Sequence, residues 1–358
     1  MSAATPHVTY VIDDLGHGGA QRQLHLTLRA LSGAGEFSVI SLSGVTEPYA
    51  TRIGALGVRV AAIPRRSGFD AARAMALATM LRRLNTGIVH AMLESADAYA
   101  FIAARLVRIP CVLSLRSDRL QTTGVRTPVL AWMMRGVPGV TVNSEAGREH
   151  LLQRVGVRAD RVTLVPNIVD VPTAVRDTTG VQPVIGAVGR LVEMKRFDIL
   201  LDTLPAVRSA VPGARIVLVG DGPARQGLEN LARREGMAGA VQFTGEVDDA
   251  GAYLSTFACL VIASTHEGLP NAALEALARG VPVVTVAAGD LPRIVTEGVT
   301  GVVARDASPQ AMSDAIIRAL TSSTLRASAA SEGPRLMRER HAPELARQAL
   351  LTLYSHLG

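Results

Sequence analysis

The sequence is poor in aromatic residues, cysteine and long hydrophobic runs. Phe, Trp and Tyr make up 3% of its 358 residues, so the cores that its 48% apolar fraction can build must be aliphatic. Its two cysteines, Cys111 and Cys259, stand in predicted strands and indicate small buried side chains in a reducing compartment. No apolar run reaches the ~20 residues that cross a bilayer, and no secretory signal pattern is present. We therefore expect a cytoplasmic protein of two ordinary-sized domains.

Lysine is almost absent. Of 37 basic residues, 36 are arginine and one is Lys195. A lysine ammonium is a compact point charge that arginine does not replace in a tight phosphate site, so the position of this residue matters. The excess positive charge lies in the first half, where 20 arginines face 13 acidic residues up to residue 177. This asymmetry fits attraction to an anionic membrane or lipid diphosphate, and equally a solvated arginine-rich surface.

Two runs of alternating strands and helices predict an α/β protein with two doubly wound, Rossmann-like sheets. Each run opens with a strand, a glycine-containing loop and a helix, at 8–31 and at 184–207. The first loop has glycines at 16, 18 and 19, which is not a dinucleotide fingerprint and disfavours a dehydrogenase. Residues 171–183, with two prolines and few apolar side chains, are typical of a linker. Further strands are expected within 37–42, 58–63, 88–91, 112–115, 140–144, 162–170, 214–223, 241–247, 258–264 and 280–286, and helices at 48–56, 73–84, 96–107, from 145, at 228–235, from 271, and at 309–320 and 343–357.

Residues 267–280 are predicted to form a loop that becomes a helix. Pro270 suits the first helical turn and Gly280 suits the helix end. Backbone N–H groups at such a helix start can bind an anion, and the run has a glutamate on each side, Glu267 and Glu275. Amides would take a phosphate, and carboxylates would accept hydrogen bonds from sugar hydroxyls. Two solvated surface glutamates are the alternative interpretation.

The motifs of the second half resemble those of retaining GT-B glycosyltransferases of family 4 type, the glycosyl transferases group 1. One motif is Glu267, seven residues, Glu275 and then a Gly-Val-Pro-Val-Val strand; the other is Gly-Arg-Leu-Val-Glu-Met-Lys at 189–195, which places the single lysine at the motif's lysine. The glycines at 18–19 resemble the family's N-terminal opening more weakly. The resemblance covers nearly the whole chain and is most specific in 186–303.

The resemblance implies GT-B architecture, with two Rossmann-like domains facing a cleft. An acceptor-side domain would span 1–173 and a nucleotide-sugar-binding domain 183–335, with a C-terminal helix in 336–358 crossing back to the first. It also implies that Arg190 and Lys195 hold the donor diphosphate, that Glu267 accepts from the sugar and that Glu275 accepts from the ribose. Arg190, Lys195 and Glu267 would be the catalytic residues. The expected donor-binding set is Gly18, Gly19, Gly189, Arg190, Lys195, Val247, Glu267, Gly268, Leu269, Pro270, Asn271 and Glu275.

The acceptor side departs from the family pattern. Arg116 stands where many members carry a histidine, and His90 lies at the end of a strand, where ligands bind in open α/β sheets. Both are candidate acceptor-side residues, with a hydrogen-bonded structural histidine as the alternative for His90. Gln21, Arg196 and Ile168 also replace residues that are common in the family.

The implied activity is retaining transfer of a hexose from a nucleotide-diphosphate sugar, with UDP favoured over GDP. The acceptor would be a glycan or lipid-linked molecule of cell-surface polysaccharide, lipopolysaccharide or glycolipid synthesis. We expect no cofactor, no metal and no nucleic-acid partner, with a peripheral position on the inner face of the membrane compatible with the basic first half. The alternatives are a sugar-nucleotide epimerase, a phosphorylase of the same fold, or a non-catalytic nucleotide-sugar-binding module.

Overall fold

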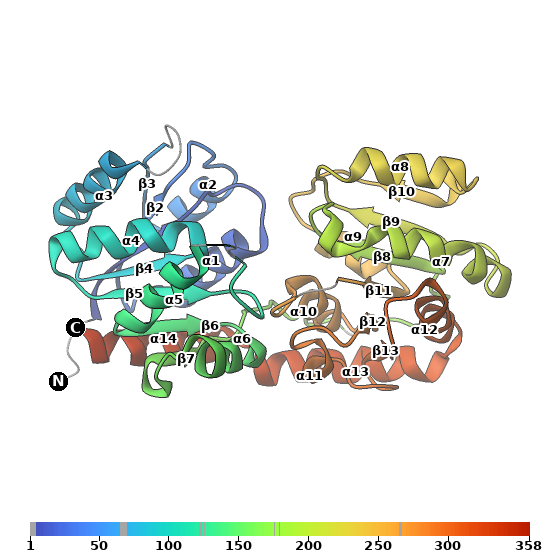
Figure 1. The fold of residues 1–358 in the computed structure, drawn as a ribbon. Helices are drawn as coiled ribbons and strands as arrows, with labels where there is room; N and C mark the ends of the chain where they lie inside the picture. The colour runs from blue at the N-terminus through green and yellow to red at the C-terminus, as the bar shows by residue number, and fades with distance from the viewer. Residues whose placement is uncertain are drawn as a thin grey trace. The chain divides into compact units, whose positions relative to one another are not determined.

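The chain folds into two α/β units, each with helices on both faces of a parallel sheet (Figure 1). The computed structural model describes residues 5–64, 70–121, 124, 126–174, 176–178, 180–264 and 267–358. One unit comprises Met1–Ile168 together with Pro343–Gly358, and the other comprises Val169–Ala342. The predicted α/β class, with two doubly wound sheets, is confirmed.

The N-terminal unit is built on a seven-stranded sheet of order β3-β2-β1-β4-β5-β6-β7. Every strand pair in it is parallel, as expected when helices make the crossovers. The strands are β1 (Thr5–Ile12), β2 (Gly35–Ser41), β3 (Arg59–Ala62), β4 (Ile88–Met92), β5 (Cys111–Leu115), β6 (Gly139–Val142) and β7 (Val162–Leu164). The order changes direction beside β1 and β4, and their carboxyl ends therefore lie at a topological switch point.

Two helical layers cover this sheet. One core cluster joins it to α1 (Gly19–Ala30), α2 (Tyr49–Gly54) and α14 (Pro343–Leu357), and another joins it to α3 (Ala71–Arg83), α4 (Glu94–Val107) and α5 (Arg126–Gly136). A short helix, α6 (Glu145–His150), continues into a single wide turn at Leu151–Val155. The last helix, α14, thus belongs to the N-terminal unit although it ends the sequence.

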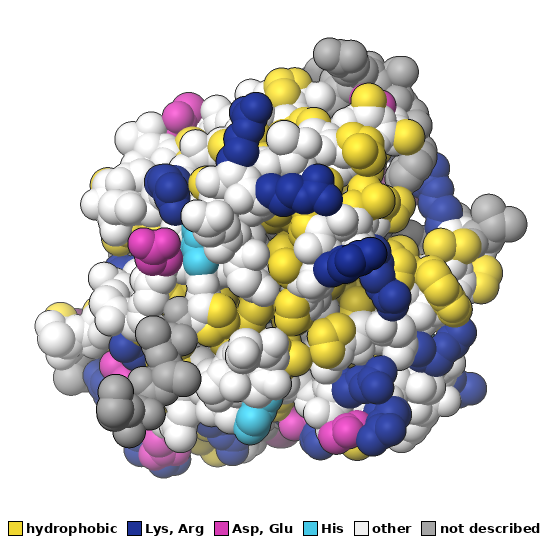
Figure 2. Space-filling view, turned by 90° about the vertical axis from the view of Figure 1, so that its left-hand side faces the viewer, with side chains coloured by type: hydrophobic (Ala, Val, Ile, Leu, Met, Phe, Trp, Pro, Cys, Tyr) yellow, Lys and Arg dark blue, Asp and Glu magenta, His cyan; other side chains and the backbone are white. Residues whose placement is uncertain are grey.

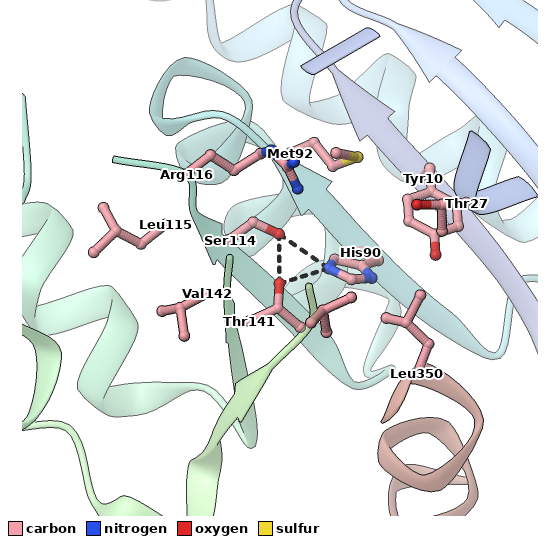
Figure 3. A pocket seen from close by; sticks show the side chains of 11 residues that line it. Tyr10, Thr27, His90, Met92, Ser114, Leu115, Arg116, Thr141, Val142 and Leu350 are labelled. Atoms are coloured by element: carbon pink, nitrogen blue, oxygen red, sulfur yellow. Dashed lines mark hydrogen bonds between the residues drawn. The ribbon is translucent and has the colours of Figure 1, made fainter. Parts of the chain in front are cut away.

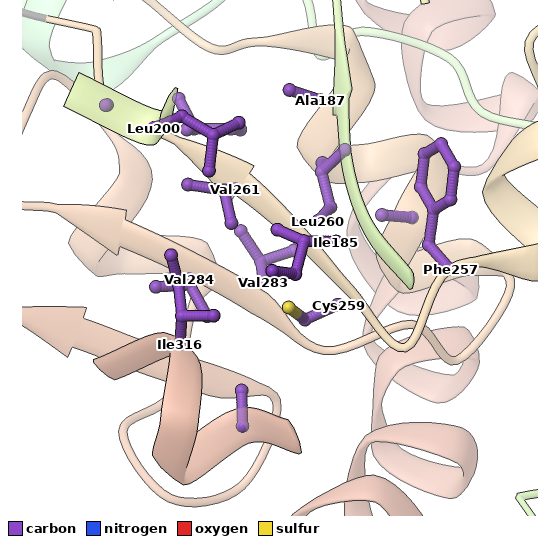
Figure 4. Packing of buried hydrophobic residues seen from close by; sticks show 14 of the residues in the cluster. Ile185, Ala187, Leu200, Phe257, Cys259, Leu260, Val261, Val283, Val284 and Ile316 are labelled. Carbon is purple, nitrogen blue, oxygen red and sulfur yellow. The ribbon is translucent and has the colours of Figure 1, made fainter. Parts of the chain in front are cut away.

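The C-terminal unit has a six-stranded parallel sheet of order β10-β9-β8-β11-β12-β13. Its aliphatic core is shown in Figure 4, where side chains of β8, β11 and β12 meet those of the helices. The strands are β8 (Val184–Val188), β9 (Arg215–Val219), β10 (Val241–Phe243), β11 (Cys259–Ile262), β12 (Val283–Val286) and β13 (Gly301–Ala304), and the helices are α7 (Phe197–Ala210), α8 (Arg225–Arg234), α9 (Gly251–Thr256), α10 (Asn271–Ala278), α11 (Leu291–Ile294), α12 (Pro309–Thr321) and α13 (Ser323–Arg340).

Helices α5, α9, α11 and α13 were not among the predicted elements. In α5 the apolar residues lie on both sides, since Leu130 is buried while Trp132 is exposed, so the sequence has no one-sided helical pattern. In α13 the interior contains Gly333 and Pro334, which normally argue against a helix. The predicted final segment, 336–358, begins inside α13, whereas the helix that packs on the N-terminal unit begins at Pro343.

Both cysteines are buried and free, in β5 and β11. Burial raises the pKa of the Cys259 thiol to about 12 and that of the Cys111 thiol still further, so both remain neutral thiols. They act as small hydrophobic side chains of the two cores.

Candidate functional site

The loop after β8 is held by backbone contacts with the loop after β9. Gly189 has φ 150°, a conformation that suits glycine. Its N–H donates to the carbonyl of Val219 at 2.9 Å. A Cβ atom at Gly220 would lie 2.2 Å from the carbonyl oxygen of Gly189, so only glycine allows this approach. These backbone contacts hold the loop that carries Arg190 and Lys195.

Lys195 forms an ion pair with Glu267, through Nζ and Oε1. Lys195 ends a short turn, Glu193–Lys195, while Glu267 follows β11, so the fold brings together residues 72 positions apart. Their side chains are 24% and 12% exposed, so the pair is partly buried and still reachable from solvent. Arg190 lies in the same loop with an exposed side chain. The sequence predicted all three residues for one site but not the ion pair.

The segment that begins with Glu267 is anchored by its backbone. Gly289 has φ 52°, and a Cβ atom there would lie 1.7 Å from the carbonyl oxygen of Glu267. The Asp290 N–H donates to the carbonyl of Gly268 at 3.0 Å. These contacts fix the direction in which the Glu267 side chain leaves the loop, and the loop then runs directly into α10.

Helix α10 begins at Asn271, with Pro270 in extended conformation immediately before it. Its residues from Ala273 to Ala278 are buried, and Glu275 among them is only 6% exposed. Burying a carboxylate is costly unless it has polar partners, so Glu275 is not the solvated surface glutamate of the alternative interpretation. Gly268 and Leu269 are buried, and Val247 is half-buried against the core of the same unit.

The glycine loop of the N-terminal unit is held by hydrogen bonds between its own residues. Gly18 and Gly19 are exposed at the start of α1. The Asp14 carboxylate accepts from the Gly16 N–H at 3.0 Å and from the Gln21 side-chain amide at 2.9 Å. A Cβ atom at Gly18 would meet the Gln21 side chain at 2.1 Å. Gln21, where the family more often has glutamate, thus braces this turn.

His90 lies in a buried polar network (Figure 3). Its Nδ1 shares a hydrogen bond of 2.7 Å with the Tyr354 hydroxyl, which lies 2.6 Å from the Tyr10 hydroxyl. Its Nε2 lies 3.0 Å from Ser114 Oγ and 3.1 Å from Thr141 Oγ1. Burial, with a smaller contribution from the positive charge of Arg116, lowers the pKa of His90 to about 3, so the ring is neutral. Both nitrogens are engaged within the fold, which is the geometry of a structural histidine.

Arg116 borders a recess at the end of β5, lined also by His90 and Ser114 (Figure 3). The recess has a volume of about 20 Å³, room for about one water molecule, so a larger ligand could lie only at its mouth. Arg116 Nη2 donates to Asn167 Oδ1 at 2.6 Å, and no described carboxylate forms an ion pair with it. Burial lowers the pKa of Arg116 to about 10, although the Tyr10 side chain favours its charge. Arg116 is therefore a half-buried cation without a counter-charge in the described chain.

Sequence reasoning missed the partners of these two N-terminal residues. Tyr354 reaches His90 from α14, and Asn167 reaches Arg116 from beyond β7. No local pattern marks such contacts, because the sheet order brings them together. Among the described residues, no three or more His, Cys, Asp or Glu side chains cluster so that they could hold a metal.

Two family descriptions together match most of the chain. "Glycosyltransferase Family 4" matches residues 17–172, and "Glycosyl transferases group 1" matches residues 182–322. The fold agrees with these matches: the Anabaena HepE structure in complex with UDP-glucose superimposes with a TM-score of 0.86 at 20% identity, over 98% of this chain and 100% of that one. The chain belongs to the glycosyltransferases of family 4 type, which have the GT-B fold.

Curated relatives match over part of their length. The lipopolysaccharide core biosynthesis glycosyltransferase LpsE of Rhizobium meliloti is 30% identical over 190 residues, 53% of this chain and 54% of that protein. A GDP-mannose-dependent phosphatidylinositol monomannoside mannosyltransferase of Mycobacterium tuberculosis is 37% identical over 150 residues, 39% of each chain. The matched stretch thus spans about half of the first relative and less of the second.

Proposed function

We propose that the protein transfers a sugar from a nucleotide-diphosphate donor to a glycan or lipid-linked acceptor, with retention of the anomeric configuration. One observation carries the proposal: the Lys195–Glu267 ion pair lies between a rigid glycine loop and the start of α10, which also buries Glu275. A cation, a helix start and two carboxylates suit a ligand that has both phosphates and hydroxyls. Family membership supports the same activity.

Each donor-side residue has a role in this proposal. Lys195 and Arg190 bind the diphosphate and stabilise the negative charge that grows on it as the bond to the sugar breaks. Glu267 accepts from sugar hydroxyls and Glu275 from ribose hydroxyls. The remaining donor contacts are Gly18, Gly19, Gly189, Val247, Gly268, Leu269, Pro270 and Asn271, with Val247 against the base and no N–H from Pro270.

The chemistry needs no nucleophile from the protein. The acceptor hydroxyl attacks from the face that the diphosphate leaves, and the leaving phosphate takes the hydroxyl proton. Two cations, Lys195 and Arg190, stabilise the leaving group, so we propose that the transfer needs neither a metal nor a cofactor. The HepE complex with UDP-glucose supports a UDP-sugar as the donor. The GDP-mannose-dependent mycobacterial relative supports a GDP-sugar as the alternative donor.

Arg116 is the acceptor-side residue that the geometry favours. A half-buried guanidinium without an acidic partner in the described chain can be stabilised by an anionic group of the ligand. We therefore assign Arg116 to a phosphate or carboxylate of the acceptor, as on a lipid-linked or lipopolysaccharide-type molecule; the LpsE relative supports cell-surface polysaccharide synthesis. His90 keeps a structural role.

A donor screen tests the proposal. Binding stabilises a fold by about 2.7 kcal/mol when ligand is present at ~100 times its Kd, so the correct nucleotide sugar should raise the unfolding temperature measurably. Incubation with that donor and lipid-linked acceptors should then release the nucleotide and form a glycosylated product. A donor that binds but is never consumed would indicate a binding module, and consumption without an acceptor product would indicate an epimerase or a phosphorylase.

A further inference from the structure

Helices α3, α4 and α5 present apolar side chains to solvent. Eight large hydrophobic side chains of the described chain are exposed, and four of them stand on these helices: Met75, Leu106, Val129 and Trp132. Trp132 is 58% exposed, although burial of a tryptophan is strongly favourable. We call these four residues, with the exposed arginines of the same helices and of the residue after α4, the α3–α5 surface; the arginines are Arg82, Arg83, Arg105, Arg108, Arg126 and Arg135.

Direct contacts join the three helices that carry the α3–α5 surface. Arg82 of α3 donates from Nη2 to the carbonyl of Leu106 in α4 at 3.0 Å. The Arg105 guanidinium lies 5.1 Å from the ring centre of Phe101, and that ring packs edge-on against Trp132 of α5 at 5.5 Å. Figure 2, which views the structure from the side of the N-terminal unit, shows hydrophobic and basic side chains side by side over the right half of the face.

The charge of this surface has one sign. Residues 71–83, 98–108 and 126–138 contain no Asp or Glu, and the two acidic residues of α4, Glu94 and Asp97, stand in its first turn. Arginines in the last turn of a helix also stabilise its C-terminus, which would account for Arg82, Arg83, Arg105 and Arg135. It accounts neither for Arg126, which begins α5, nor for the exposed Trp132. The combination therefore points to a ligand that is anionic and has an apolar layer beneath its charges.

We propose that the α3–α5 surface docks on an anionic lipid bilayer. Tryptophan prefers the membrane–water interface, and arginines beside it can pair with headgroup phosphates while their stems cover apolar area. In the described part of the chain, no helix is long and apolar enough to cross a membrane. A nucleic acid fits less well, because single-strand sites interleave several aromatic rings with their basic residues, whereas this surface exposes one.

The single tryptophan of the sequence reports on docking without a label. Vesicles of phosphatidylcholine with phosphatidylglycerol should shift the Trp132 emission to shorter wavelength and carry the protein into the pellet on centrifugation. Vesicles of phosphatidylcholine alone should do neither to the same extent, and added salt should reverse the binding. The measurement needs neither donor nor acceptor, so its result is independent of the proposed transferase activity.

Charge reversal locates the contact. Arg83→Glu with Arg126→Glu should weaken binding to the anionic vesicles roughly tenfold or more, while Arg208→Glu with Arg215→Glu, an equal charge change in the C-terminal unit, should weaken it far less. Circular dichroism checks that all variants fold. Equal loss in both pairs, no emission shift with anionic vesicles, or a lipid-free shift that grows with protein concentration and so indicates self-association, would each overturn the proposal.

Discussion

The two units handle buried polar groups in opposite ways. In the N-terminal unit, both ring nitrogens of His90 are hydrogen-bonded to Tyr354, Ser114 and Thr141, so neither is available to a ligand. In the C-terminal unit, Lys195 and Glu267 are paired but partly exposed, so a ligand can reach both. The difference teaches that burial alone does not mark a site. What matters is whether the partners of a polar group can be exchanged for those of a ligand.

Removing the lysine should have the largest effect. Lys195→Ala takes away one charged contact to the leaving diphosphate and should lower the rate of transfer about a hundredfold, roughly 3 kcal/mol. The neighbouring Arg196 forms a partly exposed ion pair with Asp198. Because such a pair contributes little energy, Arg196→Ala should change the rate less than about threefold. Single-turnover rates of both variants measure the contrast. Equal rates in the two variants would remove Lys195 from the catalytic machinery.

Substitution of Glu275 should have the second-largest effect on transfer. Glu275→Ala removes the carboxylate that we assign to the ribose, and transfer should fall at least about tenfold, with a rise in the KM for the donor. Glu193→Ala, at an unburied position of the Lys195 turn, is the matched control and should leave the donor KM nearly unchanged. Wild-type kinetics in folded Glu275→Ala protein would contradict the ribose assignment.

Arg116 tests the other unit. Arg116→Gln keeps a hydrogen-bond donor for Asn167 but removes the charge, so the KM for an anionic acceptor should rise about tenfold while the donor KM stays constant. Arg119→Gln, an exposed arginine three positions later, should leave both constants unchanged. A rise in the donor KM instead would place the Arg116 guanidinium against the donor diphosphate.

His90 should affect stability more than catalysis. His90→Phe removes both hydrogen-bonding nitrogens and should lower the free energy of unfolding by about 1–3 kcal/mol, with transfer kinetics close to wild type. Because the pKa of His90 is lowered to about 3 in the folded protein, the stability of the fold depends on pH. Below the unfolded-state pKa of about 6.5 the unfolded chain binds a proton that the folded chain refuses, so stability falls as the pH drops from there towards 3.

Chemical denaturation at several pH values measures this contribution. The wild type should lose stability more steeply than His90→Phe between pH ~6.5 and ~3, because the variant lacks the titrating ring. Parallel curves for the two proteins would mean that His90 takes up a proton as readily in the folded state as in the unfolded chain.

The donor side could be predicted from the sequence because its residues stand in short local motifs. Gly189, Lys195, Glu267 and Glu275 lie in loops and a helix start whose spacing the backbone fixes. The ion pair between Lys195 and Glu267 could not be predicted, since it depends on how β8 and β11 pair within the sheet.

The rest of the fold escaped prediction where packing overrides local preference. Gly333 and Pro334 argue against a helix, yet α13 runs through them, because a Cβ atom at Gly333 would lie 2.5 Å from the carbonyl of Leu277 in α10. Only glycine permits that close contact between the two helices. Helix α5 also has apolar side chains on its exposed side, including Trp132, so its sequence lacks the one-sided apolar pattern that predicts a helix. We connect that exposure with membrane docking.

Hydrogen exchange with mass spectrometry tests the central claim most directly, because it locates a bound nucleotide without any substitution. Saturating UDP, or GDP if the donor screen favours it, should slow amide exchange in segments 189–196 and 267–278 and leave α3 and α5 unchanged. No protection of segments 189–196 and 267–278 at a saturating nucleotide concentration, or protection only outside the proposed donor contacts, would contradict the assignment of the donor site to Lys195, Glu267 and Glu275.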